Sequence, residues 1–131
     1  MIVVDTNILA YLYLPTDSSV SAEALLTSDS GWAVPVLWRS EFRNILAGYL
    51  RRGDLTYGAV LAIQAEAEAL VAGAEHEVRS RDVLELVRDS DCSAYDCEFV
   101  ALAKALDVKL VTADKKLLRA FPDVAMGLPA V

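Results

Sequence analysis

Apolar and polar residues follow two patterns along this chain: short continuous apolar runs, and longer stretches with a helical repeat. The short runs predict strands at residues 2–4, 32–34 and 109–112. The helical repeat predicts helices over residues 6–13, 37–50, 56–71, 80–87, 94–106 and 115–120, and a further helix that follows Asp17 or Ser18 and runs through Ala22 to Thr27. Strands that alternate with helices are typical of an α/β fold, so we expect a central, mainly parallel β-sheet flanked by α-helices.

Short polar residues mark several of the expected helix starts. Thr6 and Asn7 can cap the first helix, and Asp17 or Ser18 can cap the second. Ser93 stands directly before the helix expected over 94–106. Such side chains accept hydrogen bonds from the free backbone N–H groups of a first turn, which is why they predict where a helix begins.

Length and composition indicate one domain spanning residues 1–131. A chain of 131 residues with 55% hydrophobic content can bury its own core, which excludes a disordered protein. The N-terminus has no basic stretch leading an apolar segment, so we expect neither a signal peptide nor a membrane anchor. Two cysteines, Cys92 and Cys97, are too few for a disulfide framework and are expected to be packing residues. These features favour a cytoplasmic location.

Four acidic residues stand where a single sheet edge can gather them. Asp5 and Asp114 follow strand-like runs, and the carboxyl ends of parallel strands meet at one edge. Glu41 and Asp96 border the apolar faces of their helices. Each acid alone has an ordinary structural role: a helix cap, a turn residue, a helix-dipole partner, or an ion-pair partner of an arginine. Together they favour a divalent cation, because carboxylates beside apolar segments need compensation.

The net charge of −7 is unusual for a protein that handles nucleic acid, since phosphate backbones favour basic surfaces. The excess is regional, because residues 66–98 contain ten acids and three bases and the remainder is balanced. Within the balanced part, Arg39 and Arg43 flank Glu41 and can contact phosphates. A solvated helix face explains these arginines equally well.

The arrangement of these acids resembles a known family, the PIN-domain ribonucleases, and within it the VapC-like toxins of bacterial toxin–antitoxin pairs. The resemblance covers nearly the whole chain. It rests on VVDTNI at residues 3–8, Ser40-Glu41, SAYDC at 93–97 and LVTAD at 110–114. The combination is more specific than any one of these segments.

The resemblance implies an endoribonuclease that hydrolyses RNA phosphodiester bonds with one or two Mg²⁺ or Mn²⁺ ions. The residues implied to bind the metal and direct the reaction are Asp5, Glu41, Asp96 and Asp114. Polar groups that can orient these ligands or the phosphate are Thr6, Asn7 and Thr112. Hard divalent ions choose oxygen ligands, so the donor set agrees with the implied metals. The resemblance also implies a homodimer and a small antitoxin whose tail enters the acidic groove.

Two other functions deserve comparison. A haloacid-dehalogenase-like phosphatase also begins with a strand ending in aspartate, but it requires a second acid two residues later for proton transfer. This chain has Asn7 there, which cannot transfer a proton. A non-catalytic PIN-like module that binds a metal or a partner is the second alternative, although four intact acids argue against it. His76 is the only histidine, which excludes a zinc site built from histidines.

Some aromatic and aliphatic residues have more than one expected role. Trp38 is expected in the core because it lies at helical spacing among apolar residues. Another apolar set can serve the core, a dimer interface or an antitoxin: Leu9, Tyr13, Leu46 and Leu50.

Overall fold

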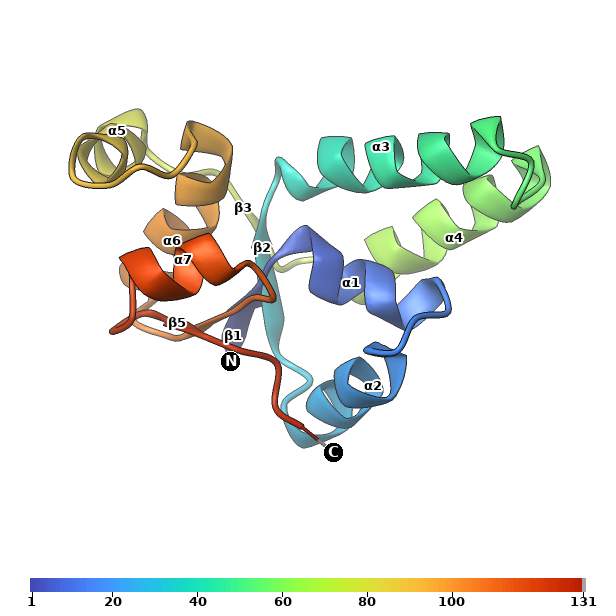
Figure 1. Cartoon of the computed structure of the whole chain (residues 1–131), viewed down its shortest axis with the longest axis horizontal. Helices are drawn as coiled ribbons and strands as arrows, with labels where there is room; N and C mark the ends of the chain where they lie inside the picture. Colours follow the sequence, from blue (N-terminus) through green and yellow to red (C-terminus); the bar gives the residue numbers. More distant parts are fainter. Residues whose placement is uncertain (131) are drawn as a thin grey trace.

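The structure is a computed structural model that describes residues 1–130, so Val131 of the expected domain lies outside the described residues. A single five-stranded sheet has the order β3-β2-β1-β4-β5, and every neighbouring pair is parallel (Figure 1). The strands are β1 (Ile2–Val4), β2 (Trp32–Pro35), β3 (Glu75–His76), β4 (Leu110–Val111) and β5 (Ala125–Met126). The helices are α1 (Thr6–Tyr13), α2 (Ser19–Ser28), α3 (Trp38–Arg51), α4 (Tyr57–Leu70), α5 (Ser80–Arg88), α6 (Ala94–Leu106) and α7 (Lys115–Ala120). The expected α/β fold with a parallel sheet is confirmed.

Strand β1 lies at the centre of the sheet, between β2 and β4. Its register pairs Val3 with Ala33 on one side and with Leu110 on the other. The chain builds outward from β1 to β2 and β3, and then crosses to place β4 on the opposite side of β1. The carboxyl edge between β1 and β4 is therefore a topological switch point, where open α/β sheets form their ligand crevices.

Helices cover both faces of the sheet (Figure 1). Helices α1 to α4 lie on one side, where α3 and α4 run side by side, and α5 and α6 lie on the other. Helix α6 packs directly against β1, β2 and β4. Trp38 and Phe42 of α3 are fully buried, and their rings meet edge to face with centroids 5.5 Å apart. The expectation that Trp38 is a core residue is confirmed.

The expected helices are all present, but one of the predicted caps is wrong. Helix α1 is capped by Asp5, whose Oδ1 accepts from the backbone N of Ile8 at 3.2 Å, rather than by Thr6 or Asn7. Ser18 stands at the N-cap of α2, as predicted, although its side chain makes no capping hydrogen bond. Ser93 does cap α6, as predicted.

The short edge strands β3 and β5 were not predicted from the sequence. Each spans only two residues, too few to show an alternating pattern. His76 lies half-buried in β3, and both cysteines are free and buried, in agreement with packing roles. Leu9 and Leu46 belong to the core, whereas Leu50 is 37% exposed. No helix within residues 1–130 is long and apolar enough to cross a membrane.

Candidate active site

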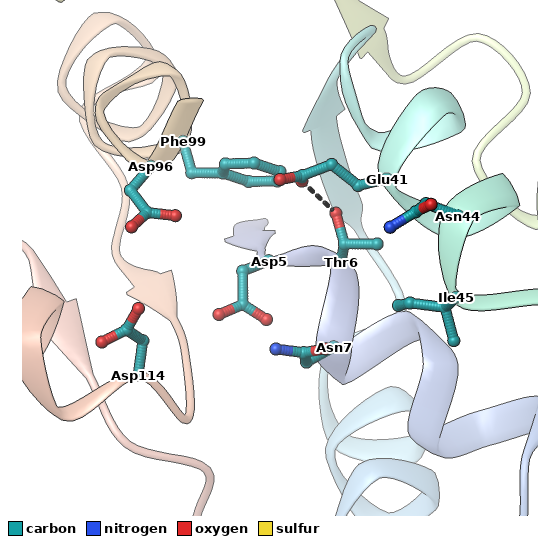
Figure 2. Close-up of a pocket in the computed structure, with 9 residues that line it drawn as sticks. All are labelled: Asp5, Thr6, Asn7, Glu41, Asn44, Ile45, Asp96, Phe99 and Asp114. Carbon is teal, nitrogen blue, oxygen red and sulfur yellow. Dashed lines mark hydrogen bonds between the residues drawn. The ribbon is translucent and has the colours of Figure 1, made fainter. Parts of the chain in front are cut away.

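A pocket with a cavity volume of about 250 Å³ opens at the carboxyl edge of the sheet (Figure 2). All four predicted acids line it. Its full lining is Asp5, Thr6, Asn7, Glu41, Asn44, Ile45, Asp96, Phe99 and Asp114. The structure thus brings together residues from α1, α3 and α6 with Asp5, which follows β1, and Asp114, which caps α7, as the carboxyl-edge argument predicted.

Asp5 is the most buried of the four acids, with 7% of its surface exposed. One carboxylate oxygen caps α1, and the other accepts a hydrogen bond from the hydroxyl of Thr112. Burial raises the pKa of Asp5 above its ordinary value, the bonds from Thr112 and the α1 backbone act against this rise, and the charge of Asp114 adds to it. The charged form of Asp5 is therefore held by hydrogen bonds but destabilised by burial and by the charge of Asp114.

Asp114 begins helix α7 and is joined to Asp5 through Thr112. Its Oδ1 accepts from the backbone N of Lys116 at 2.8 Å and of Leu117 at 3.4 Å, so it caps the helix. Its own backbone N donates to the Thr112 hydroxyl oxygen at 3.0 Å. Thr112 is fully buried. The fully buried Thr112 thus lies beneath the pocket and fixes the relation between two of the acids.

Glu41 enters the pocket from α3 and is held by Thr6, whose hydroxyl donates to Oε1 at 2.7 Å. No arginine of residues 1–130 lies within ion-pair distance of Glu41, so the ion-pair alternative for this residue is wrong. Burial raises the pKa of Glu41, and the negative charges of Asp96 and Asp5 raise it further. An opposing effect comes from the Thr6 hydrogen bond.

Asp96 lies in the first turn of α6, where its backbone N donates to the Ser93 hydroxyl oxygen at 3.1 Å. Burial raises the pKa of this carboxylate, and the charge of Asp114 raises it further. Lys116 acts in the opposite direction. Figure 2 shows Asp96 and Asp114 on one side of the pocket, facing Asp5, with Glu41 on the other side turned toward Thr6.

The model of the family described as "PIN domain" matches residues 2–122. The chain belongs to the PIN-domain family. It is 30% identical over 125 residues to Ribonuclease VapC3 of Pyrobaculum aerophilum, covering 92% of this chain and 95% of that protein.

Solved structures show the same fold. The crystal structure of PAE2754 from Pyrobaculum aerophilum superposes with a TM-score of 0.76 at 20% identity, covering 97% of this chain and 90% of that one. A toxin-antitoxin complex from Klebsiella pneumoniae superposes with a TM-score of 0.64 at 16% identity, with full coverage of both chains.

The donor set of this PIN domain suits a hard, hydrated cation. The pocket offers carboxylate, amide and hydroxyl oxygens and contains neither histidine nor cysteine, which favours Mg²⁺ or Mn²⁺ over softer metals. Within residues 1–130, no three carboxylate, imidazole or thiol groups converge closely enough to enclose one ion directly. Mg²⁺ keeps several waters and takes one or two carboxylates, so the open arrangement fits it.

The two arginines predicted to contact substrate do not line the pocket of the PIN domain. Arg39 donates through Nε and Nη2 to Glu75 at 2.6 and 2.7 Å, and through Nη1 to Glu68 at 2.9 Å. Trp38 also donates to Glu75, through its indole N at 2.7 Å. Arg43 lines a separate hollow between α3 and α4. Arg39 therefore joins α3 to α4 and β3 instead of facing the acids.

Three pocket residues were missed by sequence reasoning: Asn44, Ile45 and Phe99. Each lies one helical turn after a predicted acid, Asn44 and Ile45 after Glu41 and Phe99 after Asp96. Residues three and four apart share a helix face, so this spacing contained the signal. Phe99 and Ile45 form the apolar part of the wall of this otherwise polar pocket.

Proposed function

We propose that this PIN domain is a metal-dependent endoribonuclease and the toxin of a toxin–antitoxin pair. The observation that carries the proposal is the convergence of four carboxylates in one pocket at the topological switch point of the sheet. The similarity to a protein named as a ribonuclease supports RNA as the substrate.

Asp5, Glu41, Asp96 and Asp114 would hold Mg²⁺ or Mn²⁺, with one or two of these carboxylates bound directly and the others acting through the waters that such an ion keeps. Such an ion supplies Lewis acidity toward water and toward the charge that develops on a phosphodiester. The side chains of this domain provide the setting. Thr112 holds the Asp5 carboxylate and Thr6 holds that of Glu41, so neither has to reorganise when a cation and substrate arrive.

The raised pKa values give the same proposal an energetic basis. Burial and mutual repulsion oppose ionisation of Asp5, Glu41 and Asp96. A divalent cation relieves both, because it replaces lost hydration with direct charge compensation. The site is thus more stable with a cation than without one.

We further propose a homodimer and a small antitoxin that closes the acidic pocket. An arginine presented to two carboxylates would form a forked, charge-assisted pair and take the place of both the cation and RNA. The fold similarity to a chain from a toxin-antitoxin complex is in line with such a partner.

The phosphatase alternative does not suit the pocket, because Asn7 lines it where a second proton-transferring acid is required. A non-catalytic module remains the second candidate, and a cleavage experiment separates it. Purified protein is incubated with a mixed RNA pool in Mg²⁺, Mn²⁺ or EDTA. The Asp96→Asn variant removes one pocket charge. Asp107→Asn, at the far end of the same helix, is the matched control.

Metal-dependent cleavage that is lost in Asp96→Asn and kept in Asp107→Asn is the expected result. It would also exclude a contaminating ribonuclease, since both variants are purified in the same way. Equal cleavage by wild type and Asp96→Asn would overturn the site assignment. No cleavage by metal-loaded, antitoxin-free protein on the RNA pool would favour the non-catalytic module.

A further inference from the structure

The basic residues of this chain divide into those held by carboxylates and those that are not. Carboxylates lie within ion-pair distance of Arg39, Arg52, Arg79, Arg81 and Arg88. In the part of the chain that the structure describes, no side-chain carboxylate pairs with Arg43, Arg51, Lys104, Lys109, Lys115, Lys116 or Arg119. Three of these last residues lie on the single short helix α7.

Helix α7 presents its cations beside the pocket. Lys115, Lys116 and Arg119 are exposed, while Leu117 is buried and anchors the helix. Because residues three and four apart share a helix face, Arg119 lies next to both lysines. Asp114 caps α7 and lines the pocket, so this cationic face, defined as Lys115, Lys116 and Arg119, begins next to a pocket residue and continues along the helix.

The other free arginines are less well placed. Arg43 lines the hollow between α3 and α4, on a different face of α3 from the residues that line the pocket. Arg51 ends α3, ten residues after Glu41, which corresponds to roughly 15 Å along a helix.

Acidic residues near the cationic face form no ion pairs with it in the part of the chain that the structure describes. Asp89 and Asp91 share a surface hollow with Lys116 and Arg119, but neither is within ion-pair distance of them. Asp89 is engaged by Arg88 at 2.8 Å. The cationic face is therefore available to a ligand.

We propose that the cationic face of α7 binds the phosphates of single-stranded RNA and guides the strand into the acidic pocket. The inference rests on the proposed ribonuclease function. Four carboxylates repel a phosphodiester, so a substrate needs positive charge immediately beside them to be held. The α7 cationic face supplies that charge directly after Asp114, which caps α7 and lines the pocket.

The test measures RNA binding separately from cleavage. In an Asp96→Asn background, fluorescence anisotropy follows a labelled single-stranded RNA pool between 50 and 200 mM salt in Mg²⁺. The variant is Lys116→Gln with Arg119→Gln. The matched control is Arg43→Gln with Arg51→Gln, which removes the same charge from exposed, unpaired positions on α3.

Loss of two phosphate contacts should reduce the slope of log affinity against log salt by about 1.4 and weaken binding roughly 25-fold at 0.1 M salt. The α3 control should keep the parental slope. A charge-preserving variant, Lys116→Arg with Arg119→Lys, should keep most of the affinity, which separates charge from any effect on folding.

An unchanged slope in the α7 variant, or an equal loss in the α3 control, would overturn the proposal, as would absence of RNA binding by the parent. If the α7 variant loses a protein that co-purifies with the parent, and binds RNA as the parent does, the cationic face binds a protein partner instead of RNA. Cleavage by wild type is scored independently, so a ribonuclease with another RNA path is distinguishable from a protein that binds RNA without cutting it.

Discussion

Replacing Thr112 with valine removes a hydrogen bond to the buried carboxylate of Asp5 while leaving the side-chain volume almost unchanged. Thr112 is fully buried and also accepts from the backbone N of Asp114. A hydrogen bond to a charged group contributes about 1.5–3 kcal/mol. With an unfolding entropy of about 0.28 kcal/mol/K for 131 residues, the melting temperature should fall by roughly 5–11 °C at pH 8.

The loss should depend on pH in a defined direction. Burial raises the pKa of Asp5 and the Thr112 bond opposes this rise, so the pKa of Asp5 should be higher still in the valine variant. The bond matters most where Asp5 is ionised in the folded protein, above its folded pKa. As the pH falls through that pKa, Asp5 takes up a proton and the difference between variant and wild type should shrink.

Thermal melts at pH 8 and pH 4, followed by circular dichroism without metal, measure this difference. Thr112→Ser is the control, because it keeps the hydroxyl and loses a buried methyl group, at about 0.8 kcal/mol at either pH. A valine variant that loses the same stability at both pH values, or no more than the serine variant at pH 8, would refute the reasoning.

Three further predictions concern neighbouring groups. Asp5→Asn should abolish metal-dependent cleavage and raise the melting temperature at pH 8 but not at pH 4. The pKa of Asp5 is raised in the folded protein, so ionised Asp5 destabilises the fold at high pH, and this cost is absent below the unfolded pKa. An equal shift in melting temperature at both pH values would contradict this prediction. Thr6→Val should raise the pKa of Glu41 and move the acidic limb of the pH–rate profile to higher pH, whereas Thr6→Ser should leave it in place. Glu75→Gln should lower the melting temperature more than Glu77→Gln, since Glu77 is exposed and Glu75 receives several hydrogen bonds; equal melting temperatures would show that the Glu75 contacts do not stabilise the fold.

The central part of the fold could be predicted because its signals are local. Strands β1 and β4 are buried on both faces, so they appear in the sequence as apolar runs, and each is followed within a few residues by an acid. Parallel pairing then puts Asp5 and Asp114 at one edge without further information. The edge strand β3 gave no such signal, because a two-residue strand has no readable period.

The partner of Arg39 could not be predicted for a different reason. Glu75 lies 36 residues away in the sequence and reaches Arg39 only because β3 pairs with β2, the strand that precedes α3. The arginines near Glu41 therefore suggested a phosphate site, whereas Arg39 instead pairs with Glu68 and Glu75 of the same chain. The prediction that Thr6 caps a helix is wrong for the same reason, because its hydroxyl donates to Glu41 of α3.

Helix capping and metal binding are compatible roles for the same carboxylate. The sequence pattern around Asp5 and Asp114 therefore predicts both roles and does not separate them. One carboxylate oxygen of Asp5 and one of Asp114 accept hydrogen bonds from the first turn of a helix, which fixes the direction of each carboxyl group. The second oxygen of Asp5 is bound by Thr112, and Thr112 in turn receives the backbone N–H of Asp114. Because these bonds are made by the fold itself, the negative charges are held beside one another before any cation binds. The repulsion that results is the source of the affinity that we propose for a divalent ion.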